Sequence, residues 1–279
     1  MQEEVTMKGK KLSFIGGGNM AEAIIKGLLS KKVMTPDEII VSEPRKDRVH
    51  FLSERYQIRV IFDNQLAIQE GQIIILAVKP QVMEEVLKEI SEVVSKDKLI
   101  ISIAAGIPIS FITSFLGKDK RIVRAMPNAP AQIGMGAVAL CKGGSSTKND
   151  VQVAQKLFNT IGTSVIISET HMDAVTGLSG SGPAYIFLII EALTDGGVKM
   201  GLPRDIARAL LLQTIIGSAQ LALETGEHPS KLKDMVTSPG GTTISGLHVL
   251  EKKGVRGALM DAVVAATDRS KELAAAFKA

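Results

Sequence analysis

Three small residues near the N-terminus have the spacing of a dinucleotide-binding turn. Gly16, Gly18 and Ala21 match the pattern G-x-G-x-x-G/A, after the apolar run 12–15 and before a helical pattern. The first glycine of such a turn allows a tight bend, the second lets the ligand approach the backbone, and the third small residue lets the helix pack against the strand. The first helical turn then offers free N–H groups to a pyrophosphate. The alternative is a plain tight turn.

A second group of small and hydroxyl-bearing residues lies far along the chain, in the stretch 238–243, SPGGTT. It precedes a helical pattern, so that backbone N–H groups, the helix dipole and two hydroxyl groups converge. Since the first turn already accounts for a pyrophosphate, a substrate carboxylate suits this second anion site. The alternative is an ordinary N-cap formed by Thr242 or Thr243.

Strands must bring further ligand contacts to one edge of a sheet. The apolar runs 73–78 and 99–103 are typical of buried parallel strands. In doubly wound sheets, ligands bind beyond the carboxyl ends of the strands. We therefore expect Lys79 to project toward the cofactor crevice, and the small residues 104–106 to let a nicotinamide ring approach.

Charges of both signs follow the strand expected over 39–41, where such folds meet the adenosine ribose. Glu43 favours NAD, because a carboxylate there binds the ribose hydroxyls. Arg45, Lys46 and Arg48 favour the additional phosphate of NADP. Three cations outweigh one carboxylate beside a phosphate dianion, so we expect NADPH, with NADH possible. The alternative is that these cations form a solvated first turn of a helix.

The pattern of elements changes near residue 168. Before it, strands alternate with helices, which predicts a parallel, doubly wound α/β sheet. After it, only helical patterns occur. We therefore expect a Rossmann-type dinucleotide-binding domain over 1–168, with 1–10 as a polar tail, and an all-helical domain for dimerisation and substrate binding over 169–279.

The helical half contains a stretch, 206–223, that is apolar on nearly every side. A helix of this kind is buried, and a small helical domain can hardly cover it alone. We therefore predict a homodimer through this half. The other apolar stretch, 184–193, is too short to cross a bilayer, and 206–223 contains Arg208, so we expect no membrane association.

Composition narrows the remaining function classes. The net charge of +4 is spread along the chain and Trp is absent, so we expect no nucleic-acid partner. Cys141 is the only cysteine and the four histidines show no ligand spacing, so we expect no metal site. No signal-peptide pattern opens the chain, so we expect a cytoplasmic protein.

Six segments taken together resemble the pyrroline-5-carboxylate reductase family. GLSGSGPAY, DGGVKMGLP and SPGGTT in one order are specific, whereas the glycine turn and AVKP also occur in other dehydrogenases. The likeness extends over the chain after its first ten residues. The segments are 15–21, 77–80, 124–128, 173–185, 195–203 and 238–243.

This resemblance implies the last step of proline biosynthesis, in which NAD(P)H gives a hydride to the ring imine of 1-pyrroline-5-carboxylate and forms L-proline. It also implies a homodimer of interlocked helical domains, in some cases assembled into a larger ring such as a decamer. The carboxylate cradle carried over from the family is Gly240, Gly241, Thr242 and Thr243. The cofactor contacts are Gly16, Gly17, Gly18, Asn19, Met20, Asn64, Ala77, Val78, Lys79, Pro80, Ala104, Ala105 and Gly106, with Glu43 and Arg45 beside the ribose.

Two of these residues receive catalytic roles. A protonated imine is already electrophilic, so that no strong protein acid is required. We assign Thr243 to the substrate carboxylate and the ring nitrogen, and Lys79 to orienting the nicotinamide or ribose. Some family members carry a small hydroxyl residue in place of Glu43, and that residue meets the ribose phosphate. Glu43 at this position therefore argues against a preference for NADPH.

Two other functions compete with this one. The first is a β-hydroxyacid-type dehydrogenase, but such families place a lysine on the helical turns after 185, where this chain has none up to Glu191. The second is a non-catalytic, NADP-binding regulatory protein. The second anion site argues against it, because a pure sensor needs only one.

Overall fold

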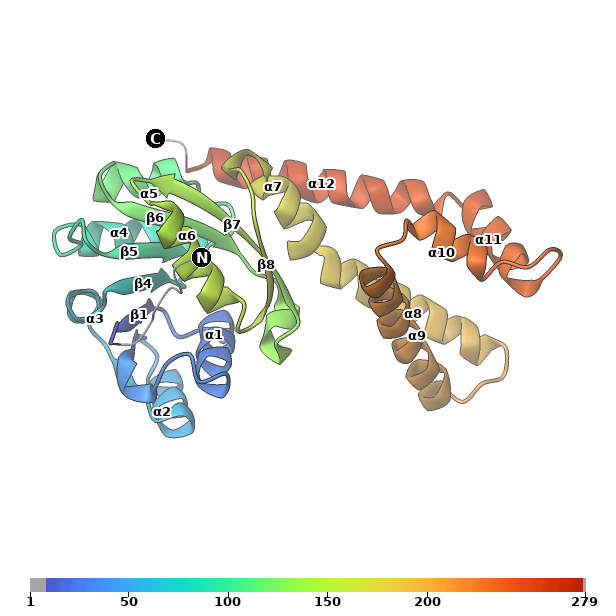
Figure 1. Cartoon of the computed structure of the whole chain (residues 1–279), viewed down its shortest axis with the longest axis horizontal. Helices are drawn as coiled ribbons and strands as arrows, with labels where there is room; N and C mark the ends of the chain where they lie inside the picture. The colour runs from blue at the N-terminus through green and yellow to red at the C-terminus, as the bar shows by residue number, and fades with distance from the viewer. Residues whose placement is uncertain (1–8, 278–279) are drawn as a thin grey trace. The chain divides into compact units, whose positions relative to one another are not determined.

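The computed structural model describes residues 9–277 and divides into two compact units (Figure 1). One unit extends to Ser181 and includes the chain from Ala265 onward, and the other is Gly182–Val264. The domain boundary near residue 168 remains a prediction. Of the predicted polar tail, residues 1–8 lie outside the described chain.

An eight-stranded sheet forms the centre of the first unit. Its order is β3-β2-β1-β4-β5-β6-β7-β8, and the strands from β1 to β6 run parallel. Four of them end in register, because Ile15 of β1 lies opposite Ser42 of β2 and Leu76 of β4, which lies opposite Ser102 of β5. The strands are β1 (Leu12–Ile15), β2 (Ile39–Ser42), β3 (Arg59–Ile61), β4 (Ile73–Leu76), β5 (Leu99–Ser102), β6 (Arg121–Met126), β7 (Gly136–Gly144) and β8 (Gly162–Ile166).

Helices cover both faces of this sheet, and each face has its own core. Leu12 and Phe14 of β1 pack on one side and Ile15 on the other, since successive side chains of a strand alternate. Burial on both sides explains the continuous apolar runs and confirms the doubly wound fold. The first core includes α1 (Asn19–Ser30), α2 (Lys46–Tyr56) and α6 (Lys148–Phe158), and the second α3 (Asn64–Glu70), α4 (Met83–Ile90) and α5 (Ile109–Leu116).

The sheet is not parallel throughout, and in this respect the prediction from the sequence was wrong. β6 pairs antiparallel with β7, and β8 runs parallel to β7. Only the 3₁₀ turn Ala129–Ile133 lies between β6 and β7, whereas a parallel connection needs a crossover of about a dozen residues or more. The sequence patterns do not indicate β3 and α5, and they indicate α2 only through the alternative of a helical turn at its start; α2 buries only Leu52, and β3 is a three-residue edge strand.

The chain after β8 contains helices joined by short loops and no strand in its described part, as predicted. A π-helical turn, Thr176–Gly180, joins α7 to α8. The helices are α7 (Met172–Val175), α8 (Gly182–Lys199), α9 (Arg204–Thr225), α10 (Pro229–Met235), α11 (Thr242–Lys252) and α12 (Val255–Ala275).

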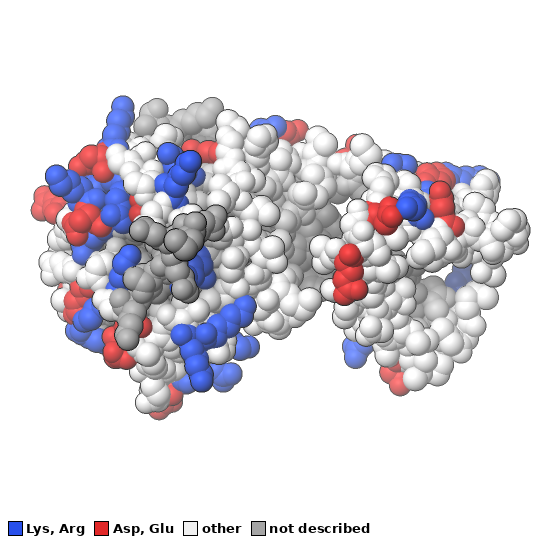
Figure 2. All heavy atoms as spheres, in the orientation of Figure 1, with Lys and Arg blue, Asp and Glu red and all other residues white. Residues whose placement is uncertain are grey.

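Helix α9 is exposed within a single chain, although its composition is that of a buried helix. Only Ala207 is buried, while Leu210, Ile216 and Leu223 are 60%, 55% and 79% exposed. Figure 2 shows that much of the visible surface of the helical unit carries no charged side chain. An apolar surface of this kind marks an interaction site.

The apolar helices also meet the length and composition of a membrane span. These are Glu169–Lys199, which continues beyond the stretch considered too short, and Arg204–Thr225. Two such helices are weak evidence for a membrane protein, because helices buried in a soluble protein meet the same criteria. Their composition alone therefore does not separate a span from an interface.

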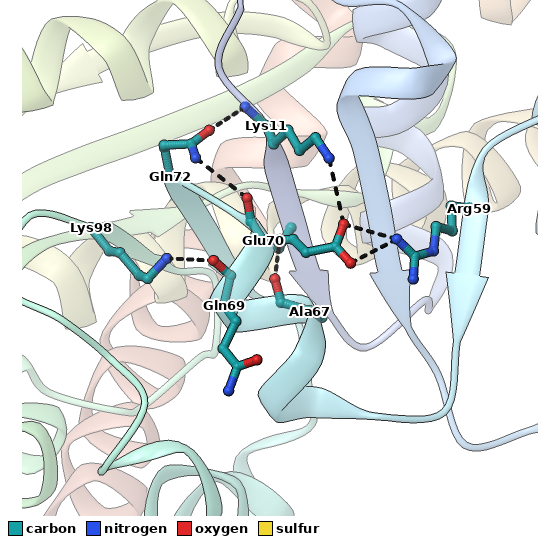
Figure 3. Close-up of polar contacts among 8 residues, drawn as sticks. Lys11, Arg59, Ala67, Gln69, Glu70, Gln72 and Lys98 are labelled. Atoms are coloured by element: carbon teal, nitrogen blue, oxygen red, sulfur yellow. Dashed lines mark hydrogen bonds and ion pairs between the residues drawn. The ribbon is translucent and has the colours of Figure 1, made fainter.

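The amino ends of the strands carry ordinary structural contacts (Figure 3). Arg59 donates to both carboxylate oxygens of Glu70, at 2.7 and 2.9 Å. Lys98 donates from Nζ to the carbonyl oxygens of Gln69 and Gly71 at the end of α3, and burial lowers the pKa of this amine. These contacts stabilise the edge of the sheet opposite the glycine turn.

Candidate functional site

The loops after β1, β4 and β5 leave the sheet at one edge. The amide of Ala77 donates to Ile15 O at 2.8 Å, and the amide of Ile103 donates to Leu76 O at 3.2 Å. These bonds continue the ladder one residue beyond the strands. They bring together the segments 16–20, 77–80 and 104–106, which were predicted to contact the cofactor.

The glycine turn has the shape that a dinucleotide requires. Gly16 has φ +97°, and a Cβ there would lie 2.7 Å from the carbonyl oxygen of Ala77, so that only glycine fits. A Cβ on Gly18 would meet nothing within 4 Å. Gly18 is the N-cap of α1 and provides no side-chain cap, which leaves the first amides of α1 available to an anion. The open position at Gly18 therefore fits a pyrophosphate.

The carboxylate of Glu43 lies beneath this turn. Oε2 accepts a hydrogen bond from the Gly17 amide at 2.8 Å, and Oε1 accepts from Arg45 Nε at 2.8 Å. The Glu43 side chain is only 6% exposed, whereas that of Arg45 is 59% exposed. Glu43 and Arg45, which favoured different cofactors in the sequence, thus form an ion pair.

Arg48 holds the other side of the turn. Its Nε donates to Gly17 O at 2.6 Å, and its guanidinium pairs with Glu22 of α1. Tyr56 donates to the same carboxylate at 2.8 Å. Burial alone would raise the pKa of Glu22, but the hydrogen bonds from Arg48 and Tyr56 bring it below its usual value. Arg48 is therefore committed to the turn, not exposed beside the ribose site as the sequence suggested.

Sequence reasoning missed Glu22 and Tyr56 as parts of the site. No spacing rule identifies them, because Glu22 bonds to Arg48, which lies 26 positions later in the sequence, and to Tyr56, which lies 34 positions later. The only signal in the sequence was the cationic character of 45–48, which favoured a phosphate instead.

Two other predicted contacts lie at the same edge of the sheet. Asn64 begins α3 just after β3, and its Nδ2 donates to Glu89 Oε2 at 2.7 Å. Asp63 caps the same helix by accepting from the Leu66 amide at 2.9 Å, as expected. Lys79 is exposed just after β4, where it precedes the 3₁₀ turn Pro80–Val82.

The second anion site lies in the helical unit and begins α11. Gly241 is the N-cap of this helix and provides no side-chain cap, so the proposed capping by Thr242 or Thr243 is wrong. Gly240 has φ +66° and open space around its Cβ position, whereas a Cβ on Gly241 would collide with Ser238 Oγ. Thr242 is exposed and Thr243 half-buried. The first amides of α11 and two hydroxyl groups thus remain for an anion.

The glycine-rich stretch before α8 packs against β6. A Cβ on Gly180 would lie 2.8 Å from Met126 Cε, and Asn128 Nδ2 donates to Ser179 O at 3.0 Å. The small residues therefore allow close packing of the π-helical turn on the sheet.

Within residues 9–277, no group of three or more His, Cys, Asp or Glu residues could hold a metal ion. His228 instead caps α10 by accepting from the Ser230 amide at 3.2 Å.

Two family models match the chain, one on each side of residue 168. The N-terminal match, to "NADP oxidoreductase coenzyme F420-dependent", spans residues 11–106. The C-terminal match, to "Pyrroline-5-carboxylate reductase dimerisation", spans residues 169–273. The first contains the glycine turn and the second contains the SPGGTT segment.

Known proteins are similar over nearly the whole chain. Pyrroline-5-carboxylate reductase of Methanosarcina acetivorans is 46% identical, over 96% of this chain and 99% of its own. The Synechocystis enzyme of the same name is 49% identical, over 94% and 98%. The structure of the Coxiella burnetii reductase has a TM-score of 0.89 at 38% identity, over 95% of this chain and 98% of its own. That of the Plasmodium falciparum reductase with NADP bound has a TM-score of 0.87 at 34% identity, over 96% and 99%.

Proposed function

Because the chain belongs to the pyrroline-5-carboxylate reductase family, we propose that it reduces 1-pyrroline-5-carboxylate to L-proline with NADPH, the last step of proline biosynthesis. The observation that carries this proposal is the near-complete similarity to reductases of that name, at 46% and 49% identity. The geometry of the two anion sites supports it. NADH is the second candidate cofactor.

The glycine turn would hold the dinucleotide. The bend at Gly16, the open position at Gly18 and the uncapped start of α1 fit a pyrophosphate. When bound, the nicotinamide supplies the hydride. Lys79 orients the nicotinamide or ribose, and the small residues 104–106 leave space for the ring. The other predicted cofactor contacts lie in the segments that directly follow β1, β2, β3 and β4.

The SPGGTT segment would hold the substrate carboxylate. The amides at the start of α11 are uncapped, and the open space around Gly240 leaves the backbone accessible from outside. Thr242 and Thr243 add hydroxyl donors. Thr243 also contacts the ring nitrogen. These groups orient a ring that is already electrophilic once protonated, and orientation alone contributes several kcal/mol, up to about 7–11.

The cellular form proposed is a cytoplasmic homodimer, with a decamer as the larger assembly, and without nucleic-acid or membrane partners. The match of residues 169–273 to a dimerisation model supports an oligomer. The exposed apolar side chains of α9, including those of Leu210 and Leu223, supply the surface that such an assembly covers.

The direct test measures oxidation of NADPH, and separately of NADH, at 340 nm with and without 1-pyrroline-5-carboxylate, and quantifies L-proline. We expect imine-dependent oxidation with one proline formed per NADPH consumed. Binding of NADPH without turnover would contradict the proposal and would favour the regulatory protein.

The roles in the second anion site need a matched pair of variants. Thr243→Ala should raise KM for the imine at least tenfold and KM for NADPH less than twofold. Thr237→Ala is the control, because Thr237 is on the neighbouring segment and its hydroxyl donates to Lys233 O at 2.7 Å. Equal effects of Thr243→Ala on both KM values would contradict the assignment.

A further inference from the structure

We propose that Glu43 is a positioning residue for the choice of dinucleotide: it holds the Arg45 guanidinium at the end of β2, where Arg45 binds a ribose 2′-phosphate. On this proposal Glu43 is not the acceptor of the ribose hydroxyls. The inference rests on the proposed function, because it assumes that the glycine turn binds a dinucleotide. It concerns contacts within the first unit alone.

Both oxygens of Glu43 are engaged by the chain itself. Oε2 accepts from the Gly17 amide at 2.8 Å. Oε1 accepts from the Arg45 amide at 3.2 Å and from Arg45 Nε at 2.8 Å. A carboxylate that receives ribose hydroxyls must present an oxygen to the ligand, but this side chain is only 6% exposed. Its hydrogen bonds and burial favour a structural role.

Arg45 has the opposite character, because its side chain is 59% exposed while its Nε is fixed by Glu43. Among the residues described, its terminal amino groups make no hydrogen bond. They remain available for an anion, and a guanidinium held at Nε presents them in a fixed plane. Such a fork suits the oxygens of a phosphate.

The neighbouring cations do not replace Arg45. Arg48 donates to Gly17 O and pairs with Glu22, and its side chain is only 14% exposed. Lys46 is exposed, but no contact fixes its amine within the described chain. Of the three cations after β2, Arg45 alone is both exposed and held in place.

The arrangement also removes the repulsion expected from a carboxylate beside a phosphate. The Gly17 N–H and the Arg45 guanidinium both compensate the charge of Glu43. Two opposite predictions follow for Glu43→Gln. If Glu43 positions Arg45, the change weakens binding of a 2′-phosphate. If Glu43 repels the phosphate, the change strengthens it.

The test is isothermal titration calorimetry with 2′,5′-ADP and 5′-AMP, which requires no catalysis. We expect Arg45→Ala to weaken 2′,5′-ADP binding at least tenfold and to change 5′-AMP binding less than twofold. Glu43→Gln should weaken 2′,5′-ADP binding three- to tenfold. The matched control is Arg59→Ala, which removes an arginine–glutamate pair at the opposite edge of the sheet (Figure 3) and should change neither.

Three results would overturn the inference. Tighter 2′,5′-ADP binding by Glu43→Gln would show repulsion, and unchanged binding by Arg45→Ala would show that another group holds the phosphate. In both cases the dinucleotide site itself would stand, because the wild type still binds. If the wild type bound neither nucleotide, the inference and the proposed dinucleotide site would fail together. Arg45→Ala removes an exposed side chain, so its result does not depend on how Glu43→Gln folds.

Discussion

Arg48 Nε donates a hydrogen bond to the carbonyl oxygen of Gly17 at 2.6 Å, across 31 positions of sequence. The same guanidinium pairs with Glu22, so that α2 is tied both to the glycine turn and to α1. On the other side, Gly17 donates its amide to Glu43. The peptide groups of the turn are thus held by a cation on one side and a carboxylate on the other.

Removal of this cation should loosen the turn. Arg48→Ala deletes a charge-assisted hydrogen bond, worth about 1.5–3 kcal/mol, and leaves Glu22 without its cationic partner. We expect NADPH to bind roughly tenfold more weakly or worse, as measured by its fluorescence on titration. Arg59→Ala serves as the control, and unchanged NADPH affinity in Arg48→Ala would contradict the role of this contact.

The two glycines of the turn should respond differently to the same added methyl group. Gly16→Ala forces a Cβ to 2.7 Å from Ala77 O at φ +97°, which should cost at least about 1–3 kcal/mol of stability. Gly18→Ala adds a Cβ in open space, so its melting temperature should hardly change, while NADPH affinity should fall. Thermal melts and NADPH titrations distinguish the two. Loss of stability in Gly18→Ala with unaltered affinity would contradict this description.

The single cysteine should be unreactive in the folded protein. Burial, with a smaller contribution from the charge of Glu169, raises the pKa of the Cys141 thiol from 9.0 to about 12. We expect no reaction with a thiol reagent at pH 8 until a denaturant is added. Rapid reaction of the native protein would show that Cys141 is accessible.

The same shift makes stability depend on pH in a defined window. The unfolded chain loses the thiol proton near its ordinary pKa of 9.0, whereas the folded chain keeps it up to about 12. The unfolded state therefore binds fewer protons, and stability falls by up to about 1.4 kcal/mol per pH unit across this range. Melting temperatures from pH 8 to 11 should fall less steeply in Cys141→Ala. Equal slopes would contradict the shift.

The exposed face of α9 should be covered by a second copy of the chain. Ile216 is 55% exposed in the single chain, and Ile216→Glu would place a charge in an apolar interface. We expect the wild type to be at least a dimer by light scattering and the variant to dissociate. Lys231→Glu is a suitable surface control, because that side chain is 70% exposed. A monomeric wild type, or its recovery in the membrane fraction, would contradict the prediction.

Local features of the sequence were sufficient for most elements of this fold. The turn at Gly16, the cap at Asp63 and the apolar runs of β4 and β5 depend on residues close in sequence, because turn chemistry and side-chain periodicity act over a few positions. The antiparallel β7 could not be predicted in this way. Its direction depends on the path of the chain between β6 and β7, which is too short for the crossover that a parallel pair requires.

The features of the site also differ in whether they could be predicted from local sequence. The sequence alone identified the Gly16–Gly18 spacing and the SPGGTT segment, since backbone groups are presented to ligands by local conformation. Only the tertiary structure decided what the charged residues do. A carboxylate such as Glu43 can accept hydrogen bonds from a ribose, an amide or a guanidinium, and the choice depends on which donor the fold brings within about 3 Å. Gly17 is 26 positions away in sequence, and its amide is one of the donors that Glu43 meets.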